Sequence, residues 1–243
     1  MAVSELGARL WHSLGMGPLW RERAANPQPM PPAESPPEPA QLNWDGLERA
    51  VAACTACGLS RTRTQTVFSA GSRSATWMFI GEAPGAEEDA RGEPFVGQAG
   101  RLLDNMLAAI GLGRERTGEQ AVFIANVLKC RPPGNRNPEG AEVAACAPFL
   151  RRQIELLHPR IIVVMGRFAV QSILATDASI ASLRGRIHEV AVANDRYPVI
   201  VTYHPAYLLR NLADKAKVWE DLCFARGSYT RIASRAERVV RED

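Results

Sequence analysis

Four short apolar runs lie between residues 76 and 203, and none of them alternates with polar positions. They occupy residues 76–80, 122–127, 161–165 and 199–203. Uninterrupted apolar strands are typical of a sheet that is covered on both faces, as parallel sheets are. Apolar residues at helical spacing occur over residues 100–110, 138–157, 168–174 and 214–224. The pattern therefore predicts an α/β fold: a three-layer α/β/α sandwich with a central, mainly parallel four-stranded sheet.

The second of these helical stretches, residues 138–157, has both a start signal and an interruption. Asn137 can cap a helix, and Pro138 suits its first turn because the first N–H groups of a helix have no partner inside the helix. Pro148 lies further along the same stretch and removes an internal hydrogen bond. We therefore expect the helix over residues 138–157 to kink or break at Pro148.

The two ends of the chain differ from this core in composition. Residues 1–23 predict an amphipathic helix, with an apolar face formed by Leu6, Leu10, Trp11 and Leu14. Residues 24–41 predict a linker, since positions 26–39 hold 7 of the 17 prolines. A compact domain is predicted over residues 42–226, and a basic tail over residues 227–243. The N-terminal helix is either a loosely docked terminus or a docking segment for a partner protein. The tail is either a solvated helix face or a DNA contact.

The overall composition is that of an ordinary globular protein, with 46% hydrophobic and 23% charged residues. A net charge of +3 permits a nucleic-acid partner without arguing for one. No apolar run is long enough to span a membrane, and Glu5, Arg9 and His12 interrupt what would be the apolar core of a secretory signal. We therefore expect a cytoplasmic protein without a membrane partner, whose cysteines do not form disulfides.

Polar and aromatic side chains follow three of the predicted strands where each strand ends. The segment from Gly81 to Gly85 follows the first strand, Asn126 lies near the end of the second, and His204 follows the fourth. Taken singly, the first segment reads as a turn, Phe95 beyond it as a core residue, Asn126 as a backbone partner and His204 as a strand-end cap. Ligands bind outside the carboxyl ends of strands in open α/β sheets. The convergence of these residues on one sheet edge therefore predicts an active site there.

Four of the five cysteines have the arrangement of a metal centre. Cys54 and Cys57 form a C-x2-C pair, and Cys130 and Cys146 are separated by 15 residues. Four thiolates suit either a tetrahedral structural zinc or a cubane iron–sulfur cluster, and the spacing alone does not choose between them. Cys223 lies in the last predicted helix, where we expect it to be a small buried apolar residue.

With these residues assembled, the chain closely resembles the family 4 uracil-DNA glycosylases, the iron–sulfur branch found in bacteria and archaea. The resemblance covers roughly residues 44–226 and rests on the segments CTACGLSRTRT, GEAPGAEEDARGEPFVGQAGRLLDNML, NVLKCRPPGNRNPEGAEVAAC and TYHPAYLLRN. It implies an α/β/α sandwich and a [4Fe–4S] cluster held by Cys54, Cys57, Cys130 and Cys146. It also implies removal of uracil from single- or double-stranded DNA, leaving an abasic site for base excision repair. We expect the protein to be a monomer.

This chain departs from the best-known branch of uracil glycosylases at three positions. Ala83 stands where that branch has an aspartate that orients water, and Gly85 where it has a tyrosine that excludes thymine. Ala206 follows His-Pro where a serine is common. The group that orients the water and the filter against thymine are therefore open at this point.

The proposed reaction assigns roles to the residues of the pocket. Phe95 is expected to stack on the uracil, and Asn126 to read its edge. His204 and the backbone N–H groups of the loop are expected to stabilise the charge that develops on uracil. Glu82 and Glu88 are candidates for supporting the sugar cation and orienting water. The expected substrate-binding residues are Gly81, Glu82, Ala83, Gly85, Phe95, Asn126, Asn135 and His204, with Asn135 as a water holder.

A base in a duplex must be flipped out of the stack before a pocket can hold it. Leu208, four residues after His204, is expected to wedge into the gap, assisted by Tyr207. Arg184, Arg186 and Arg210 are candidates for gripping phosphates. Two alternatives remain: a glycosylase that also removes hypoxanthine or xanthine, and a non-catalytic iron–sulfur or zinc module that binds nucleic acid.

Overall fold

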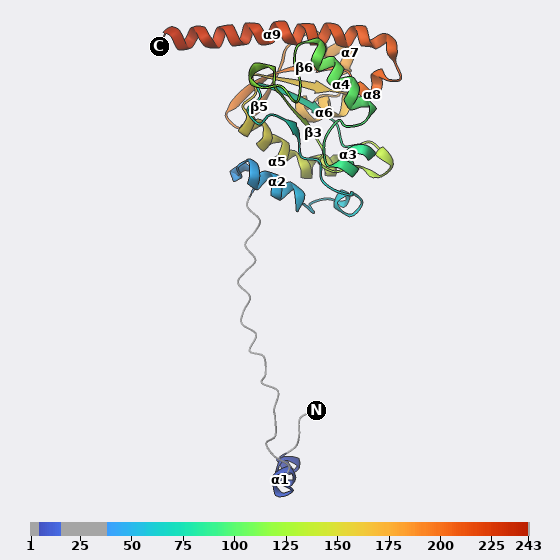
Figure 1. Cartoon of the computed structure of the whole chain (residues 1–243), viewed down its shortest axis with the longest axis vertical. Helices are drawn as coiled ribbons and strands as arrows, with labels where there is room; N and C mark the ends of the chain where they lie inside the picture. The colour runs from blue at the N-terminus through green and yellow to red at the C-terminus, as the bar shows by residue number, and fades with distance from the viewer. Residues whose placement is uncertain (1–4, 16–37, 243) are drawn as a thin grey trace. The chain divides into compact units, whose positions relative to one another are not determined.

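The computed structural model describes residues 5–15 and 38–242, and the chain divides into two units, residues 1–36 and 37–243. Within the first unit, helix α1 (Glu5–Ser13) forms where the sequence predicts an amphipathic helix (Figure 1). Leu10 and Leu14 are largely exposed. Most of the predicted linker lies outside the described residues, which take up the chain again at Glu38.

The second unit is built on a six-stranded sheet with the strand order β1-β3-β2-β4-β6-β5. The strands are β1 (Ala70–Gly71), β2 (Trp77–Gly81), β3 (Val122–Asn126), β4 (Ile161–Met165), β5 (His188–Val192) and β6 (Asp195–Thr202). The four central strands β3, β2, β4 and β6 are mutually parallel and correspond to the four predicted runs. The edge strands β1 and β5 pair antiparallel with β3 and β6.

The predicted four-stranded sheet is therefore corrected to a mixed sheet of six strands. Both additional strands differ from the pattern that identified the others. Strand β1 has only two residues, and β5 alternates exposed and covered positions because it lies at an edge of the sheet. Such an edge strand can expose polar residues on its open face. Ala193, which has a φ of 51°, begins the tight turn from β5 into β6.

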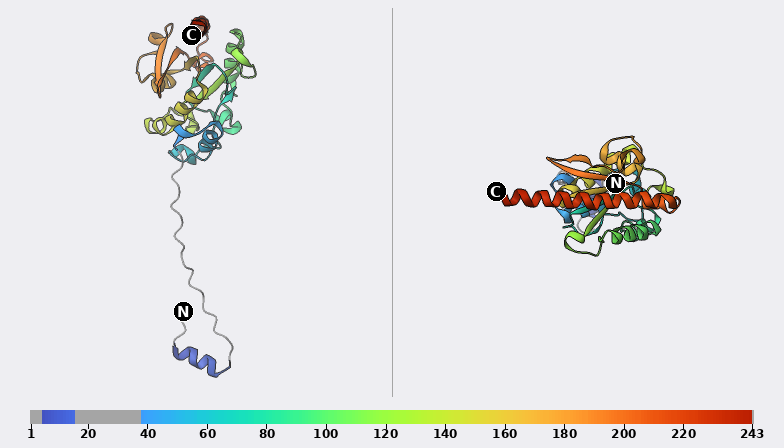
Figure 2. Two further views of the ribbon diagram at one scale, coloured as in Figure 1. Left: turned by 90° about the vertical axis from the view of Figure 1, so that its left-hand side faces the viewer. Right: turned by 90° about the horizontal axis from the view of Figure 1, so that it is seen from above.

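The helices of the second unit cover both faces of the sheet. They are α2 (Trp44–Ala52), α3 (Ala86–Arg91), α4 (Gln98–Ala109), α5 (Gly140–Leu157), α6 (Arg167–Leu174), α7 (Ile180–Leu183), α8 (Pro205–Leu208) and α9 (Lys215–Glu242). Short 3₁₀ turns occupy Pro39–Gln41, Gly58–Arg61, Gly118–Gln120, Pro133–Asn135 and Leu212–Asp214. Figure 1 shows α5 and α2 below the sheet and α9 above it, and Figure 2 shows α9 running straight across the unit.

Alternate residues of the central strands enter two separate cores. Met78 and Ile80 of β2 pack with Leu150 and Ile154 of α5 and with residues of α6. Trp77 and Phe79 of the same strand face the opposite side, where they pack with buried residues of α4 and α9. A strand that buries both of its faces has no polar positions to alternate. This explains why these strands were readable from the sequence as unbroken apolar runs.

Helix α5 does not break at Pro148. It begins at Gly140 rather than at Pro138, with Glu139 and Glu142 forming a capping box, and it continues through Pro148 to Leu157. Pro148 is exposed, so the carbonyl group that loses its helical partner can be reached by water. The next two residues, Phe149 and Leu150, are buried. Their packing favours continuation of the helix over a break at the proline.

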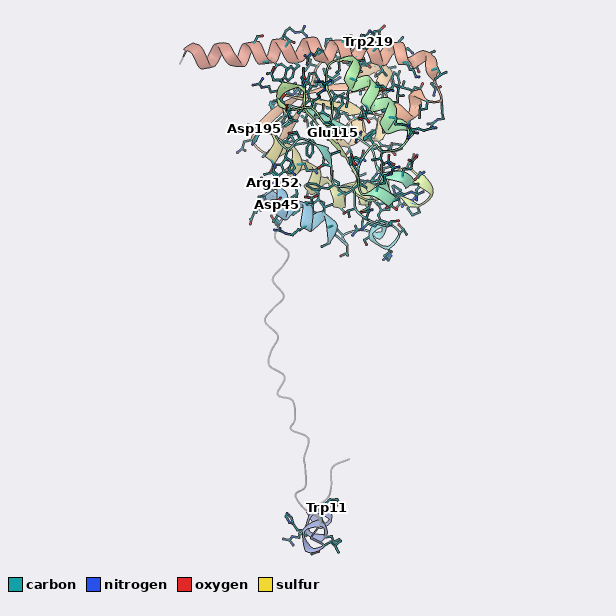
Figure 3. The ribbon with its side chains drawn as sticks, in the orientation of Figure 1. Trp11, Asp45, Glu115, Arg152, Asp195 and Trp219 are labelled. Carbon is teal, nitrogen blue, oxygen red and sulfur yellow. The ribbon has the colours of Figure 1, made fainter. Side chains whose placement is uncertain are left out.

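Helix α9 is longer than predicted and orients Cys223 differently. The helix expected over residues 214–224 begins at Lys215 and continues to Glu242, through the segment predicted as a basic tail. Val218 and Leu222 face the core, whereas Cys223 is exposed. Trp219, which Figure 3 labels on α9, is 50% exposed and lies one turn before Cys223. The prediction that Cys223 is buried is therefore wrong, because this helix turns it away from the sheet. Among the described residues, no helix is long and apolar enough to cross a membrane.

Candidate active site and cysteine centre

A cleft lies at the carboxyl ends of the parallel strands, where the sequence predicts the site. Of the predicted residues, those that line it are Glu82, Ala83, Gly85, Glu88, Phe95, Asn126, Asn135, His204, Tyr207 and Arg210. The segment after β4 also lines it, with Gly166, Arg167 and Phe168. This segment was not predicted from the sequence as part of the site. Gly166, directly after the apolar run of β4, is the sequence signal that could have indicated it.

Asn126 and Gly81 end two neighbouring strands and lie opposite each other in the sheet. Asn126 is 3% exposed, and its Oδ1 atom is buried without a hydrogen-bond partner in the part of the chain that the structure describes. A Cβ atom on Gly81 would lie 2.5 Å from that oxygen and 2.6 Å from Cζ of Phe95. Glycine at position 81 therefore leaves the space between the amide and the ring open. An unpaired buried acceptor of this kind favours a ligand that brings a donor.

Phe95 is held in a backbone conformation that non-glycine residues rarely adopt, with φ of 57°. Arg114 fixes this loop: its guanidinium donates to the carbonyl oxygens of Phe95 at 3.0 Å and Pro94 at 3.1 Å. It also pairs with Glu93 at 3.0 Å and with Asp104 at 2.9 Å. The sequence did not indicate Arg114, since the two contacts that hold this loop are with backbone carbonyls 19 and 20 residues away. The Phe95 ring lies 5.4 Å from the His204 ring, centroid to centroid, at an interplanar angle of 30°.

His204 is oriented by the helix that follows it. Its Nδ1 atom accepts a hydrogen bond from the backbone N–H of Ala206 at 3.2 Å, at the start of α8. Burial lowers the pKa of His204 to about 4, the charge of Glu88 opposes this shift and that of Arg210 adds to it. The imidazole is therefore neutral at pH 7, and because Nδ1 accepts, the proton resides on Nε2. Gly166 packs closely against it, since a Cβ there would lie 3.0 Å from Cβ of His204.

The two candidate carboxylates have different surroundings. Glu88 accepts three backbone N–H groups, from Gly85 at 3.1 Å, Val96 at 3.1 Å and Gly97 at 3.2 Å. It therefore joins the loop after β2 to the loop that carries Phe95, and it occupies the N–H of Gly85 that was expected to face the uracil. Glu82 lines the cleft, and burial raises the pKa of its carboxyl group above the ordinary range.

Asn135 lines the outer part of the cleft on an exposed 3₁₀ turn, with φ of 55°. Its Oδ1 atom accepts a hydrogen bond from Nε of Arg131 at 2.7 Å. Because this hydrogen bond uses the amide oxygen of Asn135, the amide nitrogen is the polar atom of the side chain that remains for a further contact.

Several residues predicted to contact DNA are engaged within the protein. Arg184 donates to Asp221 at 3.0 Å and to Glu220 at 3.2 Å, and Arg186 donates to the carbonyl of Ser182 at 2.8 Å. Neither arginine is among the residues that line the cleft. The guanidinium of Arg184 is held by a buried carboxylate, and its contact with phosphates stays a prediction.

The residues after His204 divide into buried and exposed ones. Leu208, predicted as the wedge, is 1% exposed and belongs to the core beneath α4 and α9, so its predicted outward position is corrected. Leu209 beside it is 40% exposed, and Arg210 is exposed at the cleft. Tyr207 donates from its hydroxyl to Asp214 at 2.6 Å and stacks on Tyr203 at 5.1 Å between ring centroids.

The four predicted ligand cysteines come together from three segments of the chain. Cys54, Cys57, Cys130 and Cys146 line one cavity. Nη1 of Arg63 donates to Sγ of Cys130 at 3.0 Å, and the backbone N–H of Lys129 donates to Sγ of Cys146 at 3.3 Å. Hydrogen bonds of this kind are common around ligating sulfurs. Burial raises the pKa of Cys146 to about 11, so this thiol needs a cation to become a thiolate at neutral pH.

The four cysteines that line this cavity are a donor set for a metal centre. Within the described residues, no three His, Cys, Asp or Glu side chains are placed so that they could hold one metal ion. Zinc requires four sulfurs at about 2.3 Å from one centre, whereas a cubane cluster fills a larger space between them. Four cysteines around one cavity are a donor set of the kind that holds an iron–sulfur cluster.

The cysteine centre and the cleft share a wall. Ala83 lines the cleft and also packs against the apolar group of Leu59, Leu128 and Cys130. Lys129 lies between Asn126 and the cysteines, and its Nζ atom donates to the carbonyl oxygen of Asn126 at 2.7 Å. Burial lowers the pKa of Lys129 to about 8, while the charges of Cys146 and Cys130 oppose this shift.

Comparison with known proteins shows to which family this chain belongs. The profile of the uracil DNA glycosylase superfamily matches residues 68–223. A type-4 uracil-DNA glycosylase of Archaeoglobus fulgidus is 45% identical over 169 residues, which cover 68% of this chain and 82% of that protein. The chain belongs to the type-4 uracil-DNA glycosylases. A type-4 enzyme of Thermotoga maritima is 42% identical over 172 residues, covering 70% of this chain and 85% of that protein. A type-5 uracil-DNA glycosylase of Pyrobaculum aerophilum is 31% identical over 149 residues, covering 57% of this chain and 64% of that protein.

Two of the four predicted ligand cysteines lie inside the region that the superfamily profile matches, and two lie outside it. Residues 68–223 include the whole cleft together with Cys130 and Cys146. Cys54 and Cys57 precede this range, on the turn that follows α2. The second cysteine pair therefore lies in a segment N-terminal to the region that the superfamily profile matches. The resemblance predicted from the sequence motifs is confirmed.

Proposed function

We propose that this chain hydrolyses the N-glycosidic bond between uracil and deoxyribose in DNA, leaving an abasic site and so initiating base excision repair. Membership in the type-4 uracil-DNA glycosylases supports this type of reaction. The observation that supports this substrate is the Oδ1 atom of Asn126, a buried acceptor that has no partner among the described residues and that belongs to a cleft beside an aromatic ring. The chemistry of the cleft is then accounted for by four residues.

Asn126 reads the edge of the base. Its Oδ1 accepts a hydrogen bond from N3–H of uracil, and its amide nitrogen donates to O4. Cytosine has an acceptor at N3 and a donor at N4, so it would leave Asn126 mismatched inside a buried pocket. A site built on buried hydrogen bonds rejects such an analogue by about 10⁴-fold. Phe95 stacks on the ring and contributes affinity without reading identity.

His204 stabilises the leaving group. As the bond between C1′ and N1 breaks, the bonding electrons remain with uracil, and negative charge builds on N1 and O2. A neutral imidazole that carries its proton on Nε2 can donate to O2 without changing its own charge. The loss of one such donor costs about 10²–10³ in rate. The Phe95 and His204 rings border the same cleft, so stacking and donation act on one bound base.

Glu82 supports the sugar. When uracil departs, the sugar becomes cationic at C1′, and an adjacent carboxylate stabilises it and orients the attacking water. The water oxygen bonds to C1′, and its proton leaves to the carboxylate or to solvent. Glu88 is already bound to three backbone N–H groups and therefore acts by holding the loops. Between the two candidates, we assign this role to Glu82.

The cysteine centre has an organising part in this proposal. Cys54, Cys57, Cys130 and Cys146 would hold a [4Fe–4S] cluster, which when bound supplies a rigid link among the three loops that carry them. The glycosidic bond is broken without a redox step. Arg210 and Arg167 are exposed at the cleft and are suited to contact the phosphates of the DNA strand.

Uracil release from a defined oligonucleotide tests the proposal. Strands that carry a single uracil, cytosine, thymine or hypoxanthine at the same position are compared in single-turnover reactions. We expect release of uracil, and a loss of about 10²-fold or more in Asn126→Asp, in which a donor becomes an acceptor. Asn194→Asp is the matched control, since Asn194 is an exposed residue in the turn between β5 and β6.

Two outcomes would contradict the proposal. No release of uracil by the wild-type protein would remove the substrate assignment. Equal activity of Asn126→Asp and Asn194→Asp would show that Asn126 does not read the base. Faster release of hypoxanthine than of uracil would favour the broader glycosylase.

A further inference from the structure

Lys129 is the most completely buried cation among the described residues. Its residue is 1% exposed, whereas the two other lysines of the chain, Lys215 and Lys217, are exposed on α9. The Nζ atom donates to the carbonyl oxygen of Asn126 at 2.7 Å and to Oε1 of Gln153 at 2.6 Å. Both acceptors are neutral. The position of this ammonium between neutral groups in the interior requires an explanation, because burying an unpaired charge is costly.

No carboxylate forms an ion pair with Lys129 in the part of the chain that the structure describes. The negative charge that reaches it comes from the cysteine centre instead. Lys129 lines the same cavity as the four cysteines. Its own backbone N–H donates to Sγ of Cys146, and Cys130 is the next residue. Four thiolates outweigh the positive charge of a cubane core, so a bound cluster is anionic and provides the missing counter-charge.

The Nζ atom at the far end of the Lys129 side chain reaches the strand end that lines the uracil pocket. Asn126 presents its side chain to the cleft while its carbonyl oxygen is held by Lys129. Gln153 keeps the ammonium in place, since its Nε2 atom donates in turn to the carbonyl oxygen of Phe68 at 3.1 Å. Lys129 therefore spans the distance between the cysteine centre and the end of the strand that presents the reading amide.

We propose that Lys129 is a positioning residue that couples the cysteine centre to base recognition: its buried ammonium is the counter-charge of the cluster and fixes the backbone of Asn126. The part that concerns Asn126 rests on the proposed function. The part that concerns the cluster does not, because it depends only on the charge beside Cys130 and Cys146. The two parts can therefore fail separately.

The geometry predicts two effects of removing the charge. A positive charge next to a cluster stabilises its more negative, reduced form, so loss of the charge lowers the reduction potential. Loss of the hydrogen bond to Asn126 lets the amide move, and misplacement of a reading group by about 1 Å costs about 10²-fold in rate. A lysine that only fills space would produce neither effect when an apolar side chain of similar length replaces it.

Three variants of the full-length protein, loaded with its cluster, separate these contributions. Lys129→Met removes the charge and the donor, Lys129→Gln removes the charge but keeps a donor, and Lys215→Met makes the same change at an exposed lysine. The reduction potential, the rate at which the absorbance near 400 nm bleaches in chelator, single-turnover uracil release and the Kd for uracil-containing DNA are measured for each.

Both Lys129 variants should have a lower reduction potential and bleach faster than wild type. Lys129→Met should lose at least about tenfold in single-turnover rate with less change in Kd, Lys129→Gln should lose less, and Lys215→Met should match wild type. If Lys129→Met does not fold, Lys129→Gln and Gln153→Met decide, since Gln153→Met removes one of the two acceptors and should lower the rate.

Each part of the proposal has its own contrary result. A wild-type potential in both Lys129 variants would overturn the counter-charge. A wild-type rate in Lys129→Met, or in Gln153→Met where the former does not fold, would overturn the coupling to Asn126. If the wild-type protein releases no uracil but the potential still shifts, the proposed function fails and the counter-charge stands.

Discussion

The guanidinium of Arg114 donates to the carbonyl oxygen of Phe95 at 3.0 Å, and this contact holds an aromatic residue at a positive φ of 57°. Gly100 closes the other side of the same loop, since a Cβ atom there would lie 1.8 Å from the Phe95 oxygen. The ring that stacks on the base is thus placed by two residues that do not line the cleft.

Arg114→Ala should therefore lower uracil release without changing the chemistry of the pocket. The change removes two hydrogen bonds to backbone carbonyls and two ion pairs, so Phe95 is free to leave its strained conformation. We expect a loss of about 10-fold to 10²-fold in the single-turnover rate and a lower midpoint of thermal unfolding. Arg116→Ala, at an exposed arginine two residues away, should match wild type. An Arg114→Ala protein as active as Arg116→Ala would show that Phe95 needs no such restraint.

Gly81→Ala should block the pocket while leaving the fold intact. The added Cβ would lie 2.5 Å from Oδ1 of Asn126 and 2.6 Å from Cζ of Phe95, in the space assigned to uracil. Gly81 does not have a positive φ, so alanine can adopt its backbone conformation. We expect a rate loss of about 10²-fold and weaker binding of uracil-containing DNA. Gly140→Ala, at a position where a Cβ atom meets nothing within 4 Å, provides the control. Unchanged uracil release in Gly81→Ala would place the base elsewhere in the cleft.

The fall of the cleavage rate at acidic pH (the acid limb of the pH profile) should be caused by protonation of Glu82 rather than of His204. Burial raises the pKa of Glu82, and its ionised form supports the sugar cation, so activity is present above this raised pKa and falls as the pH drops through it. His204 has its pKa lowered to about 4 and works as the neutral form, so it limits the rate only below that value. Single-turnover rates from about pH 4 to about pH 9 check this. Glu82→Gln should be slower and lack the limb. A limb that persists in Glu82→Gln with a midpoint near the ordinary histidine value would assign it to His204 instead.

The parts of this fold that the sequence predicted are those in which one residue type repeats along an element. Strands β2, β3 and β4 and residues 199–202 of β6 bury both faces, so each reads as an apolar run. Strand β5 alternates at the edge of the sheet and was missed. The cleft residues were found because they follow strand ends. Arg114 was not, because the sequence does not show where backbone carbonyls of a distant loop will lie. Spacing also cannot tell which side of α9 faces the core, and so Cys223 was misplaced.

The adjacent residues Leu208 and Leu209 show most clearly this limit of prediction from the sequence. Counting four residues from His204 selects Leu208 as the wedge, but the turn of α8 buries Leu208 and exposes Leu209. Leu208→Ala should therefore act as a core mutation, creating a cavity that destabilises the protein by about 2–5 kcal/mol. Its effect on activity should be the same for single- and double-stranded substrates, because no contact with DNA is lost. Thermal unfolding followed by circular dichroism, together with both cleavage rates, measures this.

Leu209→Ala should show the opposite pattern. Leu209 is 40% exposed beside Arg210 at the cleft, where it can enter the gap that a flipped nucleotide leaves in a duplex. Its removal should leave thermal unfolding near that of wild type. Uracil release from duplex DNA should fall by about tenfold or more, whereas release from single strands, in which no stack must be opened, should change little. Leu212→Ala, at another exposed leucine of the same segment, is the matched control. If Leu209→Ala cleaves duplex as fast as Leu212→Ala while a folded Leu208→Ala is slow on duplex alone, then Leu208 leaves the core when DNA binds and is the wedge after all.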